Sequence, residues 1–208
     1  TYSNCNLAYV CSQANSLCNS LGVPFQNTIN ATSTGQAGCL NTTPNPTWFY
    51  LPVSGAGTIN LQIVQTSVNG GTSDVDYVVY GPFSSLTNAC SQLSPNNIVS
   101  CSFSASANEY AVIPNAQPGQ YYLIMTTNFS NRAGFIKITE MPTTVGAINC
   151  SGLRLNAFLD LNSNGTQETG EQNFPLGQFQ YVMNQNGTTH NITAPTGVYN
   201  IYDINPAN

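Results

Sequence analysis

Charged side chains are scarce in this chain of 208 residues, because Asp, Glu, Lys and Arg together make up 5% of it. An ordinary soluble domain has roughly 25%. Asn, Thr, Ser and Gln must therefore keep the surface in solution. This composition suits salty extracellular settings, where ion pairs are screened, and it is rare in a cytosolic enzyme. The hydrophobic fraction of 41% is sufficient to build a core.

Basic residues number three, Arg132, Lys137 and Arg154. They cannot neutralise a run of phosphates, which excludes nucleic acid and anionic membrane surfaces as partners. The sequence also lacks an apolar stretch that could span a bilayer and a charged leader followed by an apolar core. We therefore expect a mature, soluble chain with no direct membrane insertion.

Residues for catalysis are scarce as well. His190 is the single histidine, and it falls in an expected hairpin strand rather than beside a nucleophile, as a hydrolytic triad requires. A glycosidase needs two carboxylates across a cleft. The acidic residues outside the loop at 160–171 have no distinctive context: Asp74, Asp76, Glu109, Glu140 and Asp203. We expect no enzymatic activity.

Seven cysteines are present, at positions 5, 11, 18, 39, 90, 101 and 150. They lack the C-x-x-C spacing of zinc ribbons, which favours disulfides and an oxidising compartment outside the cytosol. Cys90 and Cys101 flank a short polar segment, and closing that loop would stabilise the fold by about 3 kcal/mol. We also expect Cys18 to pair with Cys39 and Cys5 with Cys11, with Cys150 left over, although sequence alone does not fix the connectivity.

Apolar and polar residues alternate from Thr47 onward, as half-buried strands require. Ile59, Leu61 and Ile63, for example, are separated by Asn and Gln. Turn residues divide the strands that this pattern predicts, at 47–53, 59–63, 74–80, 98–103, 110–113, 120–127 and 135–140. Helical periodicity is limited to a turn or two at 9–17. The pattern predicts an all-β chain, with a sandwich or jelly roll first.

The alternation of apolar and polar residues is interrupted at 141–150, where Pro142 and Gly146 lie close to two threonines. We therefore expect a disulfide-containing β-sandwich at 1–142, a linker at 143–149 and a smaller, immunoglobulin-like β domain at 150–208. Its predicted strands are 153–159, 177–183, 188–192 and 198–202, with a hairpin turn at Asn186-Gly187. So few residues make a thin sandwich, and we expect the native polypeptide to continue beyond Asn208.

One segment, 160–171, matches the calcium-loop pattern D-x-[DN]-x-[DN]-G-x5-E at every defined position. Calcium prefers six to eight oxygen ligands. The spacing supplies the side chains of Asp160, Asn162 and Asn164, the carbonyl of Thr166 and a bidentate carboxylate from Glu171. The loop also contains three of the eight acidic residues of the chain. The alternative is an Asn- and Gly-rich surface turn that matches by chance.

The residues that flank this loop lack amphipathic helices, so an EF-hand is not expected. Asn at the third and fifth positions keeps the ligand charge modest, which indicates extracellular affinity of about 10⁻⁴ to 10⁻³ M. Such a calcium ion would be structural. Asp74 and Asp76 point to one face of a predicted strand, where they suggest a second metal site, a capping donor such as Arg132, or solvated edge positions.

Aromatic residues are frequent in the first domain: Trp48, Phe49, Tyr50, Tyr77, Tyr80, Phe83, Tyr121 and Tyr122. We expect most of them to pack in the core and across strands. The alternative is a sugar-stacking platform on one face of a sheet.

The first domain resembles a β-sandwich of Bacteroidetes surface proteins across about residues 5–140. The matching stretches are 39–40 (CL), 44–50 (PNPTWFY), 74–77 (DVDY), 80–83 (YGPF), 101–104 (CSFS) and 122–130 (YLIMTTNFS). That family is similar to the pre-peptidase C-terminal jelly rolls. The resemblance implies a position near the N-terminus of a very large protein that the type IX secretion system exports through the periplasm and outer membrane. Many such proteins are adhesins, including those of gliding motility.

The segment 157–171, with Gly197-Val198-Tyr199, resembles the SdrD-type B repeat, an immunoglobulin-like stalk module that binds calcium. The resemblance implies calcium ligands at Asp160, Asn162, Asn164, Thr166 and Glu171, with Glu168 binding directly or through water. Such repeats are longer than the residues that remain here, which agrees with a truncated second domain.

These features favour a non-catalytic, N-terminal region of a large secreted adhesin at the cell surface. Its partners would be an extracellular surface, a glycan or protein ligand, and other domains or subunits of a surface assembly. One alternative is a glycan-binding accessory module of a secreted polysaccharide-degrading enzyme. Another is a subunit of an extracellular filament.

Overall fold

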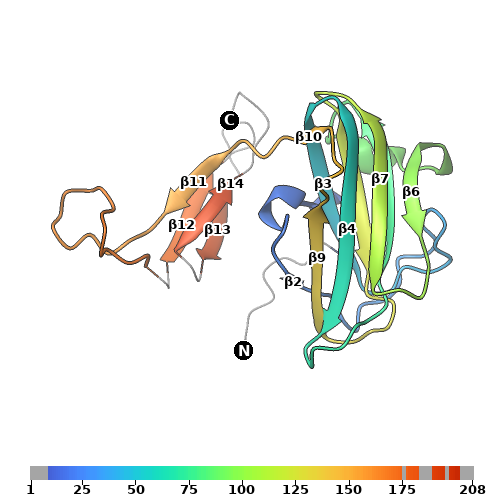
Figure 1. Ribbon diagram of the computed structural model, residues 1–208, viewed down its shortest axis with the longest axis horizontal. Helices are drawn as coiled ribbons and strands as arrows, with labels where there is room; N and C mark the ends of the chain where they lie inside the picture. Colours follow the sequence, from blue (N-terminus) through green and yellow to red (C-terminus); the bar gives the residue numbers. More distant parts are fainter. Residues whose placement is uncertain (1–8, 175–176, 183–188, 195–196, 202–208) are drawn as a thin grey trace. The chain divides into compact units, whose positions relative to one another are not determined.

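The structure is a computed structural model that describes residues 9–174, 177–182, 189–194 and 197–201. Strands dominate this part of the chain (Figure 1). Its helices are short 3-10 turns: η1 (Cys11–Gln13), η2 (Leu17–Asn19), η3 (Ala89–Gln92) and η4 (Pro95–Asn97). Within the described ranges, no helix is long and apolar enough to cross a membrane. The all-β fold class expected from the sequence is thus confirmed.

The chain divides into two compact units, Thr1–Asn149 and Cys150–Asn208. The first unit is a sandwich of two sheets. The larger sheet has the strand order β1-β3-β8-β5-β6, and β10 also pairs with β3. Its strands are β1 (Asn15–Ser16), β3 (Pro46–Gly55), β5 (Asp76–Phe83), β6 (Ile98–Ser102), β8 (Tyr121–Thr127) and β10 (Ala147–Ile148).

The smaller sheet has the order β2-β9-β4-β7. Its strands are β2 (Phe25–Gln26), β4 (Gly57–Ser67), β7 (Asn108–Ala116) and β9 (Gly134–Glu140). Strand pairs are antiparallel in both sheets apart from β1 with β3. Every strand expected in the first domain is present. The short strands β1, β2 and β10 were not expected, because two residues are too few to show an alternation.

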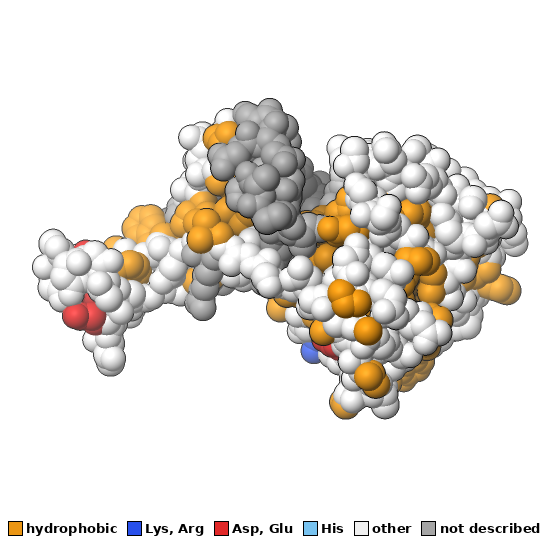
Figure 2. Space-filling model, turned by 90° about the horizontal axis from the view of Figure 1, so that it is seen from above, with side chains coloured by type: hydrophobic (Ala, Val, Ile, Leu, Met, Phe, Trp, Pro, Cys, Tyr) orange, Lys and Arg blue, Asp and Glu red, His pale blue; other side chains and the backbone are white. Residues whose placement is uncertain are grey.

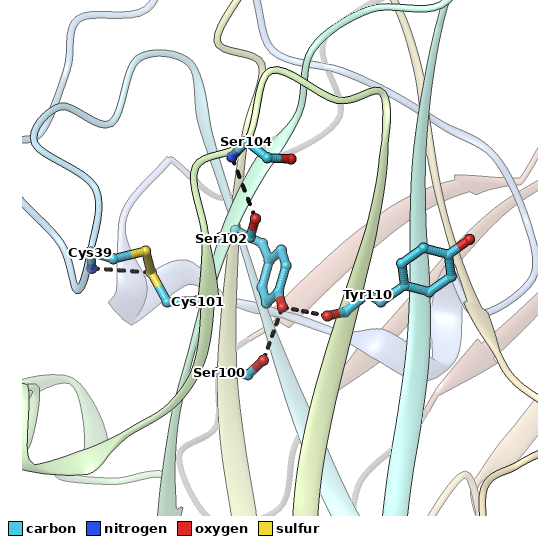
Figure 3. Close-up of a disulfide and its surroundings, with 7 residues drawn as sticks. Cys39, Ser100, Cys101, Ser102, Ser104 and Tyr110 are labelled. Carbon is cyan, nitrogen blue, oxygen red and sulfur yellow. Dashed lines mark hydrogen bonds between the residues drawn. A yellow bond between two sulfur atoms is a disulfide. The ribbon is translucent and has the colours of Figure 1, made fainter.

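The main core lies between the two sheets. On β4, Ile59, Leu61 and Ile63 are 0% exposed, and they pack with residues of β3, β5, β7, β8 and β9. Tyr77 of β5 also reaches across this core. Its hydroxyl makes a 2.9 Å hydrogen bond with Ser100 Oγ of β6 and donates a 2.5 Å bond to the carbonyl of Tyr110 on β7 (Figure 3). The hydroxyl of this tyrosine therefore connects the two sheets by hydrogen bonds through an otherwise apolar layer.

The opposite face of the larger sheet is covered as well. Val78, Leu123 and Met125 are buried there and pack with Leu40 and Ala89 of the covering segments. This second cluster explains why β5 and β8 are buried along nearly their whole length. Strands buried on both faces read as continuous hydrophobic runs rather than as alternations.

Two disulfides fix this cover to the fold. Cys11 bonds with Cys90, and Cys39 bonds with Cys101 of β6 (Figure 3). Cys18 and Cys150 are also disulfide-bonded. Disulfides of this kind indicate an oxidising compartment.

The cysteine pairs expected from the sequence are therefore wrong. Cys90 does not pair with Cys101, Cys18 does not pair with Cys39, and Cys11 does not pair with Cys5, which lies outside the described residues. Cys150 is not left over. The expected pairs were close in sequence, whereas the observed bonds join cysteines 79 and 62 residues apart that the sheet order brings together.

The segment 143–149, expected as a linker, lies along the first unit. Thr144 Oγ1 accepts a 3.0 Å hydrogen bond from Asn60 N, and Val145 N donates a 2.8 Å bond to Thr58 O. Its last part forms β10 and pairs with β3. Pro142, just before this segment, and Gly146 within it lie where the chain turns onto the edge of the sandwich.

The second unit contains two antiparallel strand pairs. β11 (Leu153–Asn156) pairs with β14 (Val198–Ile201), and β12 (Gly177–Val182) pairs with β13 (Thr189–Ala194). These strands correspond to the four that the sequence predicts. The Asn186-Gly187 turn and Asp203 lie outside the described residues.

Candidate calcium loop

The predicted calcium loop lies between two extended segments that close its base. Phe158 forms an antiparallel bridge with Asn173, and Leu159 N donates a 2.9 Å hydrogen bond to Gln172 O. Phe174 N donates a further 2.8 Å bond to Ala157 O. Because extended backbone rather than a helix flanks each end, the loop is not an EF-hand.

Gly197 packs against this base from the start of β14. Its carbonyl accepts a 2.8 Å hydrogen bond from Ala157 N. A Cβ at this position would lie 2.7 Å from Phe174 O and 2.8 Å from Ala157 O, and the backbone φ is +71°. Only glycine adopts this φ without strain and leaves room for the two carbonyl oxygens. The base of the loop therefore lies against Gly197, the residue that precedes β14.

The first half of the loop winds around the carboxylate of Asp160. Its two oxygens accept hydrogen bonds from Asn164 N (3.2 Å) and Gly165 N (2.8 Å). Asn162 Oδ1 also accepts from Asn164 N, and Asn164 Oδ1 accepts from Thr166 N at 2.7 Å. Gly165 has a φ of +76°, which is the sharp turn that the motif requires.

The last residue of the loop ties the two halves together. Glu171 Oε1 accepts a hydrogen bond from Leu161 N at 2.9 Å, and Glu171 Oε2 accepts from Glu168 N at 3.0 Å. The carboxylate of Glu168 accepts from the side-chain amides of Asn162 (2.8 Å) and Asn164 (3.0 Å). Hydrogen bonds thus link five of the side chains that the sequence singles out, those of Asp160, Asn162, Asn164, Glu168 and Glu171, to one another or to the loop backbone, and Thr166 joins them through its backbone N–H.

The chemistry of this donor set fits a hard divalent cation, because every candidate ligand atom is an oxygen. In the described part of the chain, however, no three His, Cys, Asp or Glu side chains are grouped as a metal site. In the loop, the side-chain amide N–H groups of Asn162 and Asn164 are the hydrogen-bond partners of Glu168. A calcium ion would replace these donors as the carboxylates turned inward.

Residues 161–170 of the loop are exposed to solvent, and Asp160 and Glu171 at its ends are half-buried. The loop accounts for the red acidic side chains at the left of Figure 2. Few other charged side chains appear on the face in view. On the face in view, the carboxylates are therefore concentrated in this loop.

The second predicted metal site lies in the first unit. Asp76 begins β5, and Asp74 precedes it. Both carboxyls have raised pKa values, through burial first and through nearby carboxylates second. Among the described residues, the Arg132 side chain forms no ion pair or hydrogen bond with either aspartate.

The aromatic residues mainly support the core interpretation. Trp48, Phe49, Tyr77, Tyr80, Phe83 and Tyr122 are at most 6% exposed, and Tyr50 and Tyr121 are half-buried. Trp48 and Tyr80 stack with ring centroids 6.3 Å apart beneath the covering segments. These eight residues therefore do not form an open sugar-stacking platform.

Two exposed phenylalanines were not predicted as site residues from the sequence. Phe103 is 70% exposed and Phe129 is 50% exposed, and both line the cavity that contains Asp74 and Asp76. Phe103 directly follows β6 and Phe129 lies two residues after the end of β8, where a polar turn residue is usual. An aromatic residue at such a position is the signal that could have identified them.

The remaining candidates for catalysis are dispersed. His190 lies on β13 of the second unit, opposite Tyr181, whereas Glu109 is buried on β7 and Glu140 is exposed at the end of β9. In comparisons with known proteins, no family description and no curated protein matches this chain.

Proposed function

We propose that this chain is a non-catalytic, N-terminal region of a large adhesin, exported to the cell surface by a type IX secretion system in a Bacteroidetes bacterium. Its first unit would be a display domain and its second unit a calcium-stiffened stalk module. Attachment to an extracellular glycan or protein would be its role, with gliding motility as one setting. Disulfides, sparse charge and tandem β units support this proposal.

The observation that carries the proposal is the convergence of oxygen donors in the loop at 160–171. Asp160, Asn162, Asn164, Glu171 and the carbonyl of Thr166 would hold calcium, and Glu168 would bind directly or through water. The ion would bring positive charge to a loop that carries three carboxylates. It would thereby cross-link the two halves of the loop and stiffen the module, without a catalytic step.

Calcium titration into the intact chain tests this assignment. We expect a dissociation constant of about 10⁻⁴ to 10⁻³ M by calorimetry. At about 10 mM calcium, binding of this strength stabilises the second unit by roughly 1.4–2.7 kcal/mol, so its melting temperature should rise and a chelator should reverse the increase.

Matched variants locate the ion. Glu171→Gln removes the bidentate carboxylate and should weaken calcium binding about tenfold or more, whereas Glu140→Gln, an exposed change of equal charge on the first unit, should leave it unaltered. Absence of heat on titration, with a melting temperature that ignores chelators, would contradict the stalk-module proposal.

The adhesive role needs its own measurement. Beads coated with the chain should be retained on glycan- or protein-coated glass more strongly than beads coated with an inert protein. Retention on every surface equal to that of the inert control would count against attachment as the function, whatever the outcome for calcium.

A further inference from the structure

A cavity of about 240 Å³ opens at one end of the larger sheet in the first unit. Its walls come from the segment 39–42, the start of β5, and the chain immediately after β6 and β8. The Cys39–Cys101 disulfide holds the segment 39–42 against β6. One wall of the cavity is therefore fixed to the larger sheet by a covalent cross-link.

Hydrogen bonds fix the walls on the side of β5. Gln65 Nε2 donates to Asp74 O at 3.0 Å and to Asn128 Oδ1 at 2.8 Å, and the hydroxyls of Ser73 and Ser130 are 2.5 Å apart. These contacts join the segments that carry Asp74 and Phe129. The cavity is thus preformed.

The acceptors in and beside the cavity lack donors. Asp76 is 4% exposed, and no described residue donates a hydrogen bond to its carboxylate. Asp74 Oδ1 is buried without a hydrogen-bond partner. Thr127 lies opposite Asp76 in the β5–β8 pair, and its buried Oγ1 also has no partner. Buried polar atoms nearly always have a partner in native proteins, so the unpartnered Asp74 Oδ1 and Thr127 Oγ1 beside the Asp76 carboxylate indicate a ligand that donates hydrogen bonds.

The charge around these acceptors identifies the ligand as a cation. Glu109, 6% exposed, lies near enough to raise the pKa of both aspartates after the larger effect of burial, and its carboxylate accepts a hydrogen bond from Ser104 Oγ. No lysine or arginine of the described chain pairs with this group. A cation would relieve the repulsion and allow Asp76 to ionise.

The lining distinguishes an organic cation from calcium. Calcium takes six to eight oxygen ligands, and within the described ranges no three His, Cys, Asp or Glu side chains are grouped so that they could hold a metal ion. Exposed Phe103 and Phe129 instead form part of the wall. A phenyl ring attracts an ammonium group through its π face and gives an alkyl stem an apolar surface.

We propose that this cavity binds a primary ammonium group on an alkyl chain, such as the lysine side chain of a partner protein or a free alkylamine. The three N–H donors of an ammonium match Asp74 Oδ1, Thr127 Oγ1 and the Asp76 carboxylate. Asn41 and Thr42 at the edge of the cavity supply polar contacts to whatever carries the amine. The proposal concerns the first unit, and it holds or fails independently of calcium binding by the second.

The test is titration of n-butylammonium and of Nα-acetyl-lysine amide into the intact chain, followed by calorimetry and by chemical-shift changes near Asp76. We expect millimolar binding of at least one amine. Nα-acetyl-norleucine amide, which has the same four side-chain carbons without the ammonium group, should bind at least tenfold more weakly. Preference for the lysine derivative would identify a protein partner, and preference for butylammonium a free amine.

Variants assign the binding to this cavity. Asp76→Asn, which keeps the shape of the side chain, should weaken amine binding at least tenfold, and Phe103→Ala should weaken it several-fold. Glu140→Gln, an exposed change of equal charge, should not. Binding of both amines that Asp76→Asn leaves unaltered would overturn the proposal. The proposal would also be overturned if Asp76→Asn abolished calcium binding and Glu171→Gln did not.

Discussion

At the scale of single residues, the chain shows how much a carboxylate depends on its surroundings. In the loop at 160–171, the half-buried carboxylates of Asp160 and Glu171 accept hydrogen bonds from backbone N–H groups, and Glu168 is exposed. Asp76, by contrast, is buried, and no described residue donates a hydrogen bond to its carboxylate. Burial, with the charges of Asp74 and Glu109, raises its pKa to about 7. Desolvation penalises the ionised form, and nearby negative charges add to the effect.

This raised pKa predicts a pH dependence of stability. The folded chain retains the Asp76 proton up to about pH 7, whereas the unfolded chain loses it near pH 4. Between these values the folded state binds more protons, so stability should fall as pH rises, by at most about 1.4 kcal/mol per pH unit from this group. The contribution is complete below pH 4 and absent above the folded pKa.

Denaturant titrations from pH 4 to 8, without added amine or calcium, check this expectation. Asp76→Asn should flatten the profile and stabilise the protein near pH 8, because an uncharged amide replaces a buried charge. A variant whose stability follows the same pH profile as the parent chain would show that Asp76 does not titrate in this range.

At the scale of strands, close backbone approach limits which residues the sheets accept. Gly134 begins β9, and a Cβ there would lie 1.9 Å from Thr66 O on the neighbouring strand β4. Neither backbone can move without breaking ladder hydrogen bonds. This position is determined by the distance between two strands and not by a turn.

We therefore predict that Gly134→Ala destabilises the first unit by roughly 2–4 kcal/mol, since overpacking against backbone cannot be relieved by a side-chain rotation. Gly71→Ala is the matched control, because its Cβ would meet only Ser67 Oγ at 3.4 Å. Denaturant unfolding of both variants measures the difference. Equal stability of the two would mean that β4 and β9 are not in such close contact.

At the scale of the whole molecule, disulfides compensate for the absence of a third layer. The outer face of the larger sheet is covered by loop segments, which have few ladder hydrogen bonds of their own. The Cys11–Cys90 and Cys39–Cys101 bonds attach those segments to the sandwich. Because charged side chains are sparse, ion pairs contribute little to holding these segments on the sheet.

Removing either bond should therefore expose the second cluster. In the chain-entropy model, loops of 62 and 79 residues each correspond to about 4 kcal/mol. We expect Cys39→Ala/Cys101→Ala and Cys11→Ala/Cys90→Ala to lower the melting temperature by roughly 8–16 °C.

The single tryptophan, Trp48, reports on this change, because it is 6% exposed in the second cluster. Its fluorescence emission should shift to the red in either variant before the sandwich unfolds. An unchanged emission maximum and a melting temperature within a few degrees of the parent chain would show that the cover holds without the disulfides.

The sequence by itself determined the strands and the calcium-loop motif, because both depend on neighbours in the chain. The alternation at 58–63 identifies which side chains of β4 face the core, and the twelve positions of the loop at 160–171 are contiguous. The hydrogen bonds that backbone N–H groups donate to Asp160 and Glu171 also follow from the spacing of residues within this one loop.

The tertiary structure alone decided the cysteine pairs, the double burial of β5 and β8, and the cavity beside Asp76. Each depends on strand order, which places β8 between β3 and β5 and brings the segment 39–42 over β6. Period-two patterns state which face of a strand is apolar but not which strand lies beside it. Contacts between distant segments are therefore selected by the packing of the whole sandwich.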